Sequence, residues 1–271
     1  MATTWLLNFE EVEKRSPASV PILQLSAVLA ADDIFEQLLL VCAKEFGLLA
    51  CTDELAFAEQ LAALTDFSLI QREQTTARYS IHRMVQAVIW HGLTEAERQD
   101  WTQRAIAGLN AVFPDVTKFE NWQICGRLVP HVQAIAKLTA ATWSTTTWAS
   151  LLNQAGYYLT EQGRYGAAET LYQRSLQIIE QQLGVDHPDT ATSLNNLAHL
   201  YYSKRRYSEA EPWYLWAIAI LFNHLEDDHP NTQMVWNNFQ QFLEQVLQER
   251  RTRELSDHQL TQHLLEELAW N

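Results

Sequence analysis

The chain has 271 residues, with 33 acidic against 19 basic side chains, so its formal net charge at pH 7 is -14. Apolar residues make up 47% of it, enough for a sizeable core, and the charged fraction of 19% is too low for a disordered tail. Its 8 glycines and 7 prolines disfavour a turn-rich β-sandwich and a doubly wound fold with glycine-rich loops. The composition therefore predicts a folded, mainly helical chain of one to three modules.

The cysteines and the apolar runs exclude several classes of protein. Cys42, Cys51 and Cys125 lie far apart, so they build neither a disulfide framework nor a four-ligand zinc site. Acidic residues follow the first nine residues at once, which is the wrong charge for an export or transit signal. The longest apolar runs, such as residues 38–43, are far shorter than the roughly 20 residues of a membrane span. We expect a cytoplasmic chain with no metal and no membrane partner.

The first part of the chain predicts short helices and a β-hairpin. Residues 1–20 are expected to form an N-terminal helical arm, and residues 21–93 a separate module. In this module two alternating segments, 68–72 and 78–81, flank a polar turn at 74–77, which is typical of a hairpin. Three helices with a hairpin make a winged helix.

This module resembles the winged-helix part of the NB-ARC signalling ATPases, also called signal-transduction ATPases with numerous domains (STAND). The resemblance begins before the module and rests on Trp5-Leu6-Leu7, on residues 23–29, on residues 61–72 and on residues 79–86. In that family a Met-His-Asp motif lies here, and its histidine contacts the β-phosphate of bound ADP. The matching residues are Ile81-His82-Arg83, so the family's aspartate is absent and its role is not carried over.

The resemblance implies that His82 is a vestige of nucleotide sensing. The chain has no Gly-Lys pair, so it lacks the phosphate-binding loop that a nucleotide needs. We therefore expect no cofactor and place any nucleotide-binding domain outside this chain. Whether the chain is a fragment or a gene product descended from a larger switch stays open, as does a plain structural role for His82.

A winged helix can instead bind DNA through a basic recognition helix. The candidate recognition helix, residues 53–65, carries three acidic residues and no lysine or arginine. The hairpin adds only Arg72 and Arg78, with Glu73 between them. We expect no nucleic-acid partner.

Residues 94–140 predict a helical connector between the two halves. Thr94 and Glu97 form a capping box at the start of one helix, and a second helix is expected over residues 122–138. Residues 139–147, rich in threonine and alanine, mark the joint.

A repeated unit dominates the second half, because Asp186-His187-Pro188 recurs 42 residues later (228 − 186) as Asp228-His229-Pro230. The same offset relates Ala168-Glu169 to Ala210-Glu211. Inside the unit the apolar residues follow a helical period, so each repeat predicts two helices. Gly184 suits a helix end, and the prolines suit helix starts.

The unit resembles the tetratricopeptide repeat, most closely its kinesin light chain variant, through residues 186–188, 194–198 and 206–212. The resemblance implies an α-α superhelix over residues 148–250, in which the first helix of each pair lines a groove. At the offset of 42 the third copy decays, which is typical of a terminal cap: Gln248, Glu249 and Thr252 take the places of Arg206, Tyr207 and Ala210. Residues 251–271 are expected to form a capping helix that begins at Ser256, with Ser256 and Gln259 as a capping box.

On the family's register, eight side chains are candidates for binding an extended peptide in the groove. Asparagine both donates and accepts hydrogen bonds, and tyrosine adds contact area at low entropic cost. The candidates are Asn153, Tyr157, Thr160, Asn195, His199, Tyr202, Asn237 and Gln241. The asparagines could equally bond neighbouring loops and hold the repeats in register, and both interpretations stay open.

Catalytic motifs are missing from the sequence: it contains no nucleophile elbow, no His-Glu-x-x-His helix and no Ser/His/Asp arrangement. We therefore expect a non-enzymatic, mainly α protein with a winged-helix module and tetratricopeptide-like repeats. Its expected role is the sensor arm of a STAND/NB-ARC-type signalling system that binds a protein or peptide. The alternative is a winged-helix DNA-binding transcription regulator whose repeats receive the signal.

Overall fold

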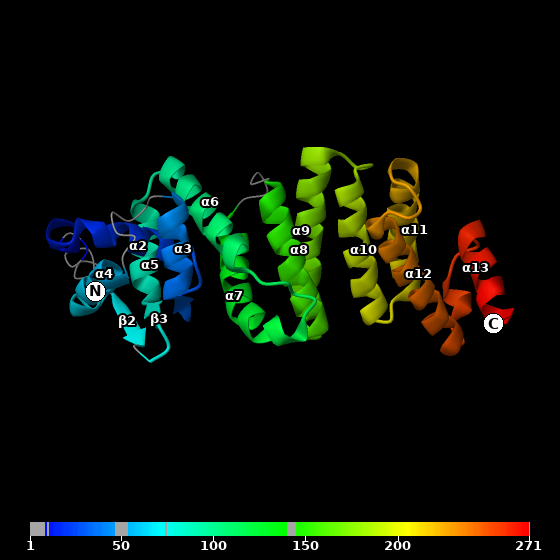
Figure 1. The fold of residues 1–271 in the computed structure, drawn as a ribbon, viewed down its shortest axis with the longest axis horizontal. Coiled ribbons are helices and arrows are strands. Elements are labelled where there is room, and N and C mark those ends of the chain that lie inside the picture. Colours follow the sequence, from blue (N-terminus) through cyan, green and yellow to red (C-terminus); the bar gives the residue numbers. More distant parts are fainter. Residues whose placement is uncertain (1–8, 10, 47–53, 74, 140–144, 271) are drawn as a thin grey trace. The chain divides into compact units, whose positions relative to one another are not determined.

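The computed structural model describes residues 9, 11–46, 54–73, 75–139 and 145–270. The chain divides into two compact units, residues 1–140 and residues 141–271. The described residues are mainly helical, with one small sheet in the first unit and a stack of helical repeats in the second (Figure 1). None of their helices has the length and apolar content needed to cross a membrane.

The first unit contains helices, short 3-10 turns and a three-stranded sheet, and its described residues 11–15 are also helical. The helices and turns are η1 (Pro17–Ser19), α2 (Val20–Ser26), α3 (Glu36–Phe46), α4 (Glu54–Asp66), α5 (Arg83–Gly92), α6 (Glu95–Val112), η2 (Phe119–Asn121) and α7 (Trp122–Leu138). The strands are β1 (Ile34–Phe35), β2 (Ile70–Glu73) and β3 (Arg78–Ile81). Side chains from most of these helices meet in one core, among them Leu23, Leu38, Leu61, Val85, Leu109 and Val132.

The sheet confirms the predicted hairpin and adds a strand to it. β2 and β3 pair antiparallel, with Ile70 opposite Ile81 and Glu73 opposite Arg78. β1 pairs with the other edge of β3, so β3 is central. The sequence did not predict β1, because two residues are too few to show an alternating pattern.

The predicted capping box at the start of α6 is confirmed. Thr94 Oγ1 accepts from the Glu97 backbone N–H, and the Glu97 carboxylate accepts from the Thr94 backbone N–H at 2.8 Å. Further along, α6 packs closely on α3, since a Cβ added to Gly108 would lie 2.0 Å from Cys42 Sγ. The helix expected over residues 122–138 is α7.

A buried histidine on α7 secures the segment that precedes β1. His131 is fully buried, its Nδ1 lies 3.1 Å from the Ala30 backbone nitrogen, and its Nε2 lies 3.3 Å from the Asp33 carbonyl oxygen. Nδ1 must accept from the Ala30 N–H, so the proton is on Nε2 and is donated to Asp33. Burial lowers the pKa of His131 to about 4, which keeps the ring neutral.

The second unit is a series of antiparallel helix pairs that lie side by side (Figure 1). We call α8, α10 and α12 the first helices, and α9 and α11 the second helices. The elements are α8 (Thr146–Glu161), α9 (Tyr165–Leu183), α10 (Pro188–Ser203), α11 (Tyr207–His224), α12 (Pro230–Gln248), η3 (Thr252–Glu254) and α13 (Gln259–Trp270).

The two Asp-His-Pro segments start helices, as the sequence predicted. Pro188 and Pro230 are the first residues of α10 and α12, and each preceding histidine is the N-cap. The Nδ1 atom of His187 accepts from the Asp189 N–H at 3.1 Å, and that of His229 accepts from the Asn231 N–H at 3.2 Å. The first residue of a helix has no intrahelical partner for its N–H, and proline has no N–H there. The histidine Nδ1 then accepts from the next backbone N–H.

The turn from first to second helix corrects the predicted alignment of the third copy. This turn needs one residue with positive φ, and the residues there are Gly163 (φ 70), Arg205 (φ 57) and Arg250 (φ 57). The first two are 42 residues apart (205 − 163), but the last two are 45 apart (250 − 205), because α12 has 19 residues and α10 has 16. The counterparts of Arg205 and Arg206 are therefore Arg250 and Arg251, and the predicted replacement of Arg206 by Gln248 is wrong.

The chain after this turn does not form a full second helix like α9 or α11. Only the 3-10 turn η3 forms, and α13 starts at Gln259. The predicted capping box at Ser256 is therefore wrong. The Ser256 hydroxyl and backbone N–H both donate to the carboxylate of Glu211, at 2.8 and 2.7 Å.

Glu211 on α11 explains why the C-terminal segment folds back onto the stack. Its counterpart one repeat earlier, Glu169, accepts from the Tyr201 hydroxyl at 2.7 Å and from Lys204 Nζ at 2.8 Å. At the offset of 45 that the turn shows, the positions equivalent to these two donors are Val246 and Glu249, and neither side chain can donate. Glu211 is 1% exposed and takes its hydrogen bonds from Ser256 and, at 2.7 Å, from the hydroxyl of Thr261 on α13.

Candidate functional site

The first helices carry a row of half-buried rings that crosses the repeats. Tyr157 on α8 stacks on His199 of α10, with ring centroids 6.4 Å apart and planes 13° apart. His199 meets Tyr202 edge-on at 6.0 Å, and Tyr202 meets the buried Phe242 of α12 at 5.9 Å. We call Tyr157, His199 and Tyr202 the aromatic row, and the surface around it the first-helix face.

The aromatic row is uncharged at neutral pH. Burial lowers the pKa of His199, an effect that the nearby Glu161 carboxylate opposes. Burial also raises the pKa of Tyr202, so its hydroxyl keeps its proton. The row therefore presents aromatic surface with neutral groups that can donate or accept hydrogen bonds.

Three of the eight candidates form hydrogen bonds inside the stack. The Asn153 side-chain amide donates to Ser193 Oγ at 3.1 Å, and the Asn195 side-chain oxygen accepts from the Asn238 amide at 3.1 Å. These two bonds join α8 to α10 and α10 to α12, and Asn195 is only 3% exposed. Thr160 is buried too, and its hydroxyl donates to the Gly156 carbonyl at 3.0 Å.

The other two candidates are exposed on α12. Asn237 and Gln241 lie on the last first helix, which has no further repeat against it among the described residues. Sequence reasoning missed Ser193 and Asn238 as partners of the asparagines. Asn238 follows Asn237 directly, as Asn196 follows Asn195, but the repeat offset alone does not show which of two adjacent asparagines reaches the neighbouring helix.

The charge of the first-helix face is negative. No lysine or arginine occurs in α8, α10 or α12. Glu161 and Glu244 are both exposed, and in the described part of the chain neither forms an ion pair. A ligand on this face would meet carboxylates and rings and no basic side chain.

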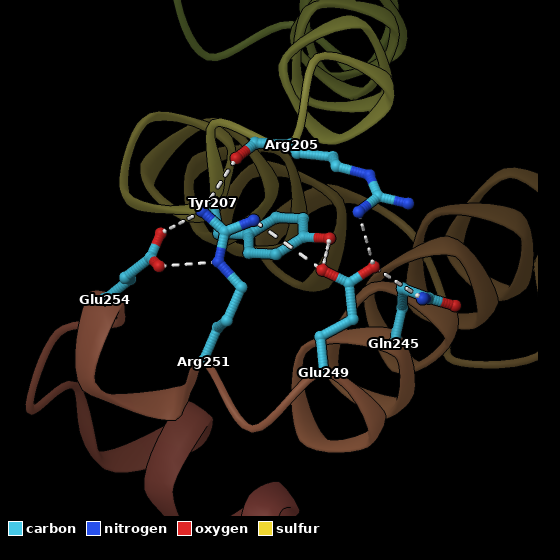
Figure 2. A network of polar contacts seen from close by, with 6 residues as sticks. All are labelled: Arg205, Tyr207, Gln245, Glu249, Arg251 and Glu254. Carbon is cyan, nitrogen blue, oxygen red and sulfur yellow. Dashed lines mark hydrogen bonds and ion pairs between the residues drawn. The ribbon is translucent and has the colours of Figure 1, made fainter.

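Two arginines, Arg205 and Arg251, lie instead at the turns, where they join the second and third repeats (Figure 2). Glu249 is the centre of this network. It accepts from Gln245 at 2.9 Å and from the Tyr207 hydroxyl at 2.9 Å, and these hydrogen bonds lower its pKa. Arg205 lies 3.5 Å from the same carboxylate, and the guanidinium of Arg251 lies 4.4 Å from the centre of the Tyr207 ring.

The network extends beyond Glu249. Arg251 donates to the Arg205 carbonyl at 3.2 Å and to Glu254 at 2.6 and 2.9 Å (Figure 2). Arg205 and Arg251 are therefore used for internal contacts that hold the turns together.

In the first unit, His82 is the N-cap of α5. Its Nδ1 accepts from the Met84 backbone N–H at 3.2 Å, and its side chain is exposed. No group of histidine, cysteine and carboxylate side chains that could hold a metal occurs among the described residues.

The two hairpin arginines are paired with carboxylates. Arg72 on β2 makes two hydrogen bonds to Glu36, at 2.7 and 2.8 Å. Arg78 on β3 lies 2.8 Å from Asp33 and above the ring of Phe35. Neither is available as a lone positive charge for a phosphate.

Comparison with known proteins agrees with the division into two units. Residues 149–221 match the model of the tetratricopeptide repeat. The second unit is a stack of tetratricopeptide-like repeats. Residues 10–98 match a family described only as a domain of unknown function (DUF7779).

A curated relative is similar over most of the chain. A "Nucleotide-binding leucine-rich repeat (NLR)-like protein" of Hyaloscypha variabilis is 30% identical over 197 residues, an alignment that covers 71% of this chain. The same alignment covers 19% of that protein, so the chain spans about a fifth of its length. Among solved structures, BtubC (BKLC) from P. vanneervenii is 14% identical, with a TM-score of 0.45 over 86% of this chain and 89% of that one.

Proposed function

We propose that the first-helix face binds an extended peptide segment of a protein partner. The observation that carries this proposal is the aromatic row, since Tyr157, His199 and Tyr202 are in contact across two repeats and stay half-exposed. Rings of this kind give contact area with few rotatable bonds, which is typical of peptide-binding surfaces. Tetratricopeptide repeats are a protein-interaction fold, which supports the same role.

The exposed side chains set the expected contacts. His199 and Tyr202 form the centre, and Asn237 and Gln241 supply donors and acceptors on α12. Asn153, Asn195 and Thr160 would act indirectly, by fixing the spacing of the first helices. Because the face carries Glu161 and Glu244 and no basic residue, its peptide is neutral or basic.

We further propose that the chain is the sensor arm of a STAND/NB-ARC-type system, in which the first unit is a winged helix that relays occupancy of the repeats to a nucleotide-binding domain. Support comes from the Ile81-His82-Arg83 motif and from the curated relative named as NLR-like. In this role His82 would cap α5 in every state and meet a nucleotide only through another domain. Such a relay requires two conformations whose balance the peptide changes.

The experiment is a screen of an immobilised random peptide library with the full chain, followed by affinity measurements on the selected peptides. His199→Ala and Gln241→Ala should each weaken binding by about tenfold, the loss expected for a central interface contact. The matched control is Gln181→Ala, an exposed glutamine of the second helix α9. It should leave the affinity unchanged.

Two results would contradict the proposal. In the first, the selected peptides bind His199→Ala and Gln241→Ala as tightly as the wild-type chain, which would mean that they bind elsewhere. A library that yields no specific peptide would count against peptide binding altogether.

A further inference from the structure

A cavity of about 140 Å³ lies between the second helices α9 and α11, on the side of the stack that the proposed peptide does not use. Its apolar lining includes the buried Leu176 of α9 and Leu197 of α10. Tyr201 of α10 and Trp213 of α11 contribute aromatic walls. Its volume is close to the roughly 150 Å³ of an engineered cavity that admits benzene, so it can hold one side chain.

The polar part of the wall consists of one carboxylate and two side-chain amides. Glu180 lines the cavity, together with the amides of Gln173 and Gln177. In the described part of the chain Glu180 has no ion-pair partner, and no lysine or arginine lines the cavity. This combination of an unpaired carboxylate with the Trp213 ring attracts a cation.

The nearby basic residues do not fill this role, because they are already paired. Lys204 and Arg206 lie above the Tyr201 ring at 5.3 and 5.0 Å. Lys204 is bound to Glu169, and Arg206 is bound to Glu209. The Tyr201 hydroxyl is donated to Glu169 and its ring already has these two cations above it, so Tyr201 contributes only wall surface to the cavity.

The second aromatic wall belongs to a pair of tryptophans. The Trp213 ring stacks on Trp216 of the same helix, with centroids 6.2 Å apart and planes 20° apart. A flat group that enters the cavity can lie against the Trp213 indole.

We propose that this cavity receives the side chain of an arginine from a partner protein. The aliphatic stem contacts Leu176, the guanidinium lies against the Trp213 indole, and its N–H groups donate to the Glu180 carboxylate. Arginine suits the cavity better than lysine because its planar fork stacks on a ring and binds a carboxylate with two hydrogen bonds.

This site is separate from the first-helix face. Leu197 and Tyr201, which line the cavity, are one helical turn apart on α10 and share a side of it. His199 lies two residues from each of them, about 200° around the helix, so it projects from the other side. The partner can therefore occupy the cavity whether or not a peptide is bound to the aromatic row.

The test uses the full chain labelled with 5-fluorotryptophan, with the Trp213 signal assigned from the spectrum of Trp213→Phe. The probe is acetyl-arginine N-methylamide, compared with the uncharged acetyl-citrulline N-methylamide and with the lysine derivative. We expect a saturable shift of the Trp213 signal with the arginine probe at millimolar concentration, and no such shift with citrulline. Glu180→Gln should weaken binding about tenfold, since a hydrogen-bonded charge pair is lost.

The matched control is Glu226→Gln, which removes an exposed carboxylate of the loop between α11 and α12, outside the cavity. It should bind the arginine probe as the wild-type chain does. The proposal is overturned if citrulline shifts Trp213 equally, if lysine binds as tightly as arginine, or if Glu180→Gln and Glu226→Gln behave alike. The comparison of the arginine and citrulline probes uses the wild-type chain, so it tests the proposal even if a variant is unstable.

Discussion

His131 is a buried side chain whose contacts require the neutral ring. The Ala30 N–H donates to Nδ1, and a protonated imidazole cannot accept it. The folded pKa of about 4 lies below the ordinary value of 6.5, so in this interval the unfolded chain binds the extra proton more readily. The stability that His131 contributes is therefore complete above about pH 6.5 and is lost as the pH falls through about 4.

This predicts an acid-sensitive term in the free energy of unfolding of the chain. Between pH 6.5 and 4 that free energy should fall by roughly 3 kcal/mol more in the wild type than in His131→Gln, which has no group to titrate there. Urea unfolding at a series of pH values measures it. His91→Gln, at an exposed position near the end of α5, is the control and should keep the wild-type slope. Parallel curves for the wild type and His131→Gln would show that the ring carries no such term.

For single residues, the sequence predicted contacts between neighbours along the chain and missed contacts between distant residues. Thr94 and Glu97 are three residues apart, so their capping box can be read from spacing. His131 meets Ala30 and Asp33 about a hundred residues away along the chain, and no spacing encodes such a contact. The pairing of Glu211 with Ser256 and Thr261 was missed for the same reason.

Packing between elements can be tested at two glycines on neighbouring helices. A Cβ added to Gly156 of α8 would lie 2.7 Å from the ring of Tyr172 on α9, and that ring is fully buried and cannot move aside. A Cβ added to Gly166 of α9 would meet nothing within 4 Å. The two positions therefore separate close packing from helix propensity.

Gly156→Ala should destabilise the chain by about 1–3 kcal/mol, the usual cost of overpacking a core. Gly166→Ala should be neutral or stabilise it by up to about 1 kcal/mol, because alanine favours helix. Thermal unfolding followed by circular dichroism measures both. Equal melting temperatures for the two variants would mean that α8 and α9 separate without cost.

Elements that follow a strong period were predictable, and irregular ones were not. The helix pairs, their starting prolines and the hairpin follow from the repeat and from alternation. α12 is three residues longer than α10, and nothing in the sequence indicates this difference. It becomes clear only from the positive φ of Arg250 in the structure. The late start of α13 depends on Glu211, which holds Ser256 outside the helix.

The charge of the whole molecule predicts that it does not bind DNA. The net charge is -14, and both hairpin arginines are paired with carboxylates. A mixed-sequence duplex should therefore show no retardation in a gel shift at about 0.1 M salt, where a basic winged helix would bind. Retardation that weakens as salt is added would favour the transcription-regulator alternative.

The sequence predicted which face of the repeats to consider but not which of its side chains are accessible. The eight candidates follow from the register of the repeat. Their burial depends on what lies against each first helix: Asn195 is covered on α10, while Asn237 on α12 is exposed. The cavity beside Glu180 gave no sequence signal at all, because residues of three helices form it.

Glu211 also bears on how the array could be extended. An added helical pair would have to displace Ser256 and Thr261, and the buried carboxylate would lose the three hydrogen bonds that these residues donate. A buried carboxylate without such partners costs several kcal/mol. Lengthening the solenoid by grafting would therefore require that the added pair supply new donors, or that the acid be replaced by an apolar residue.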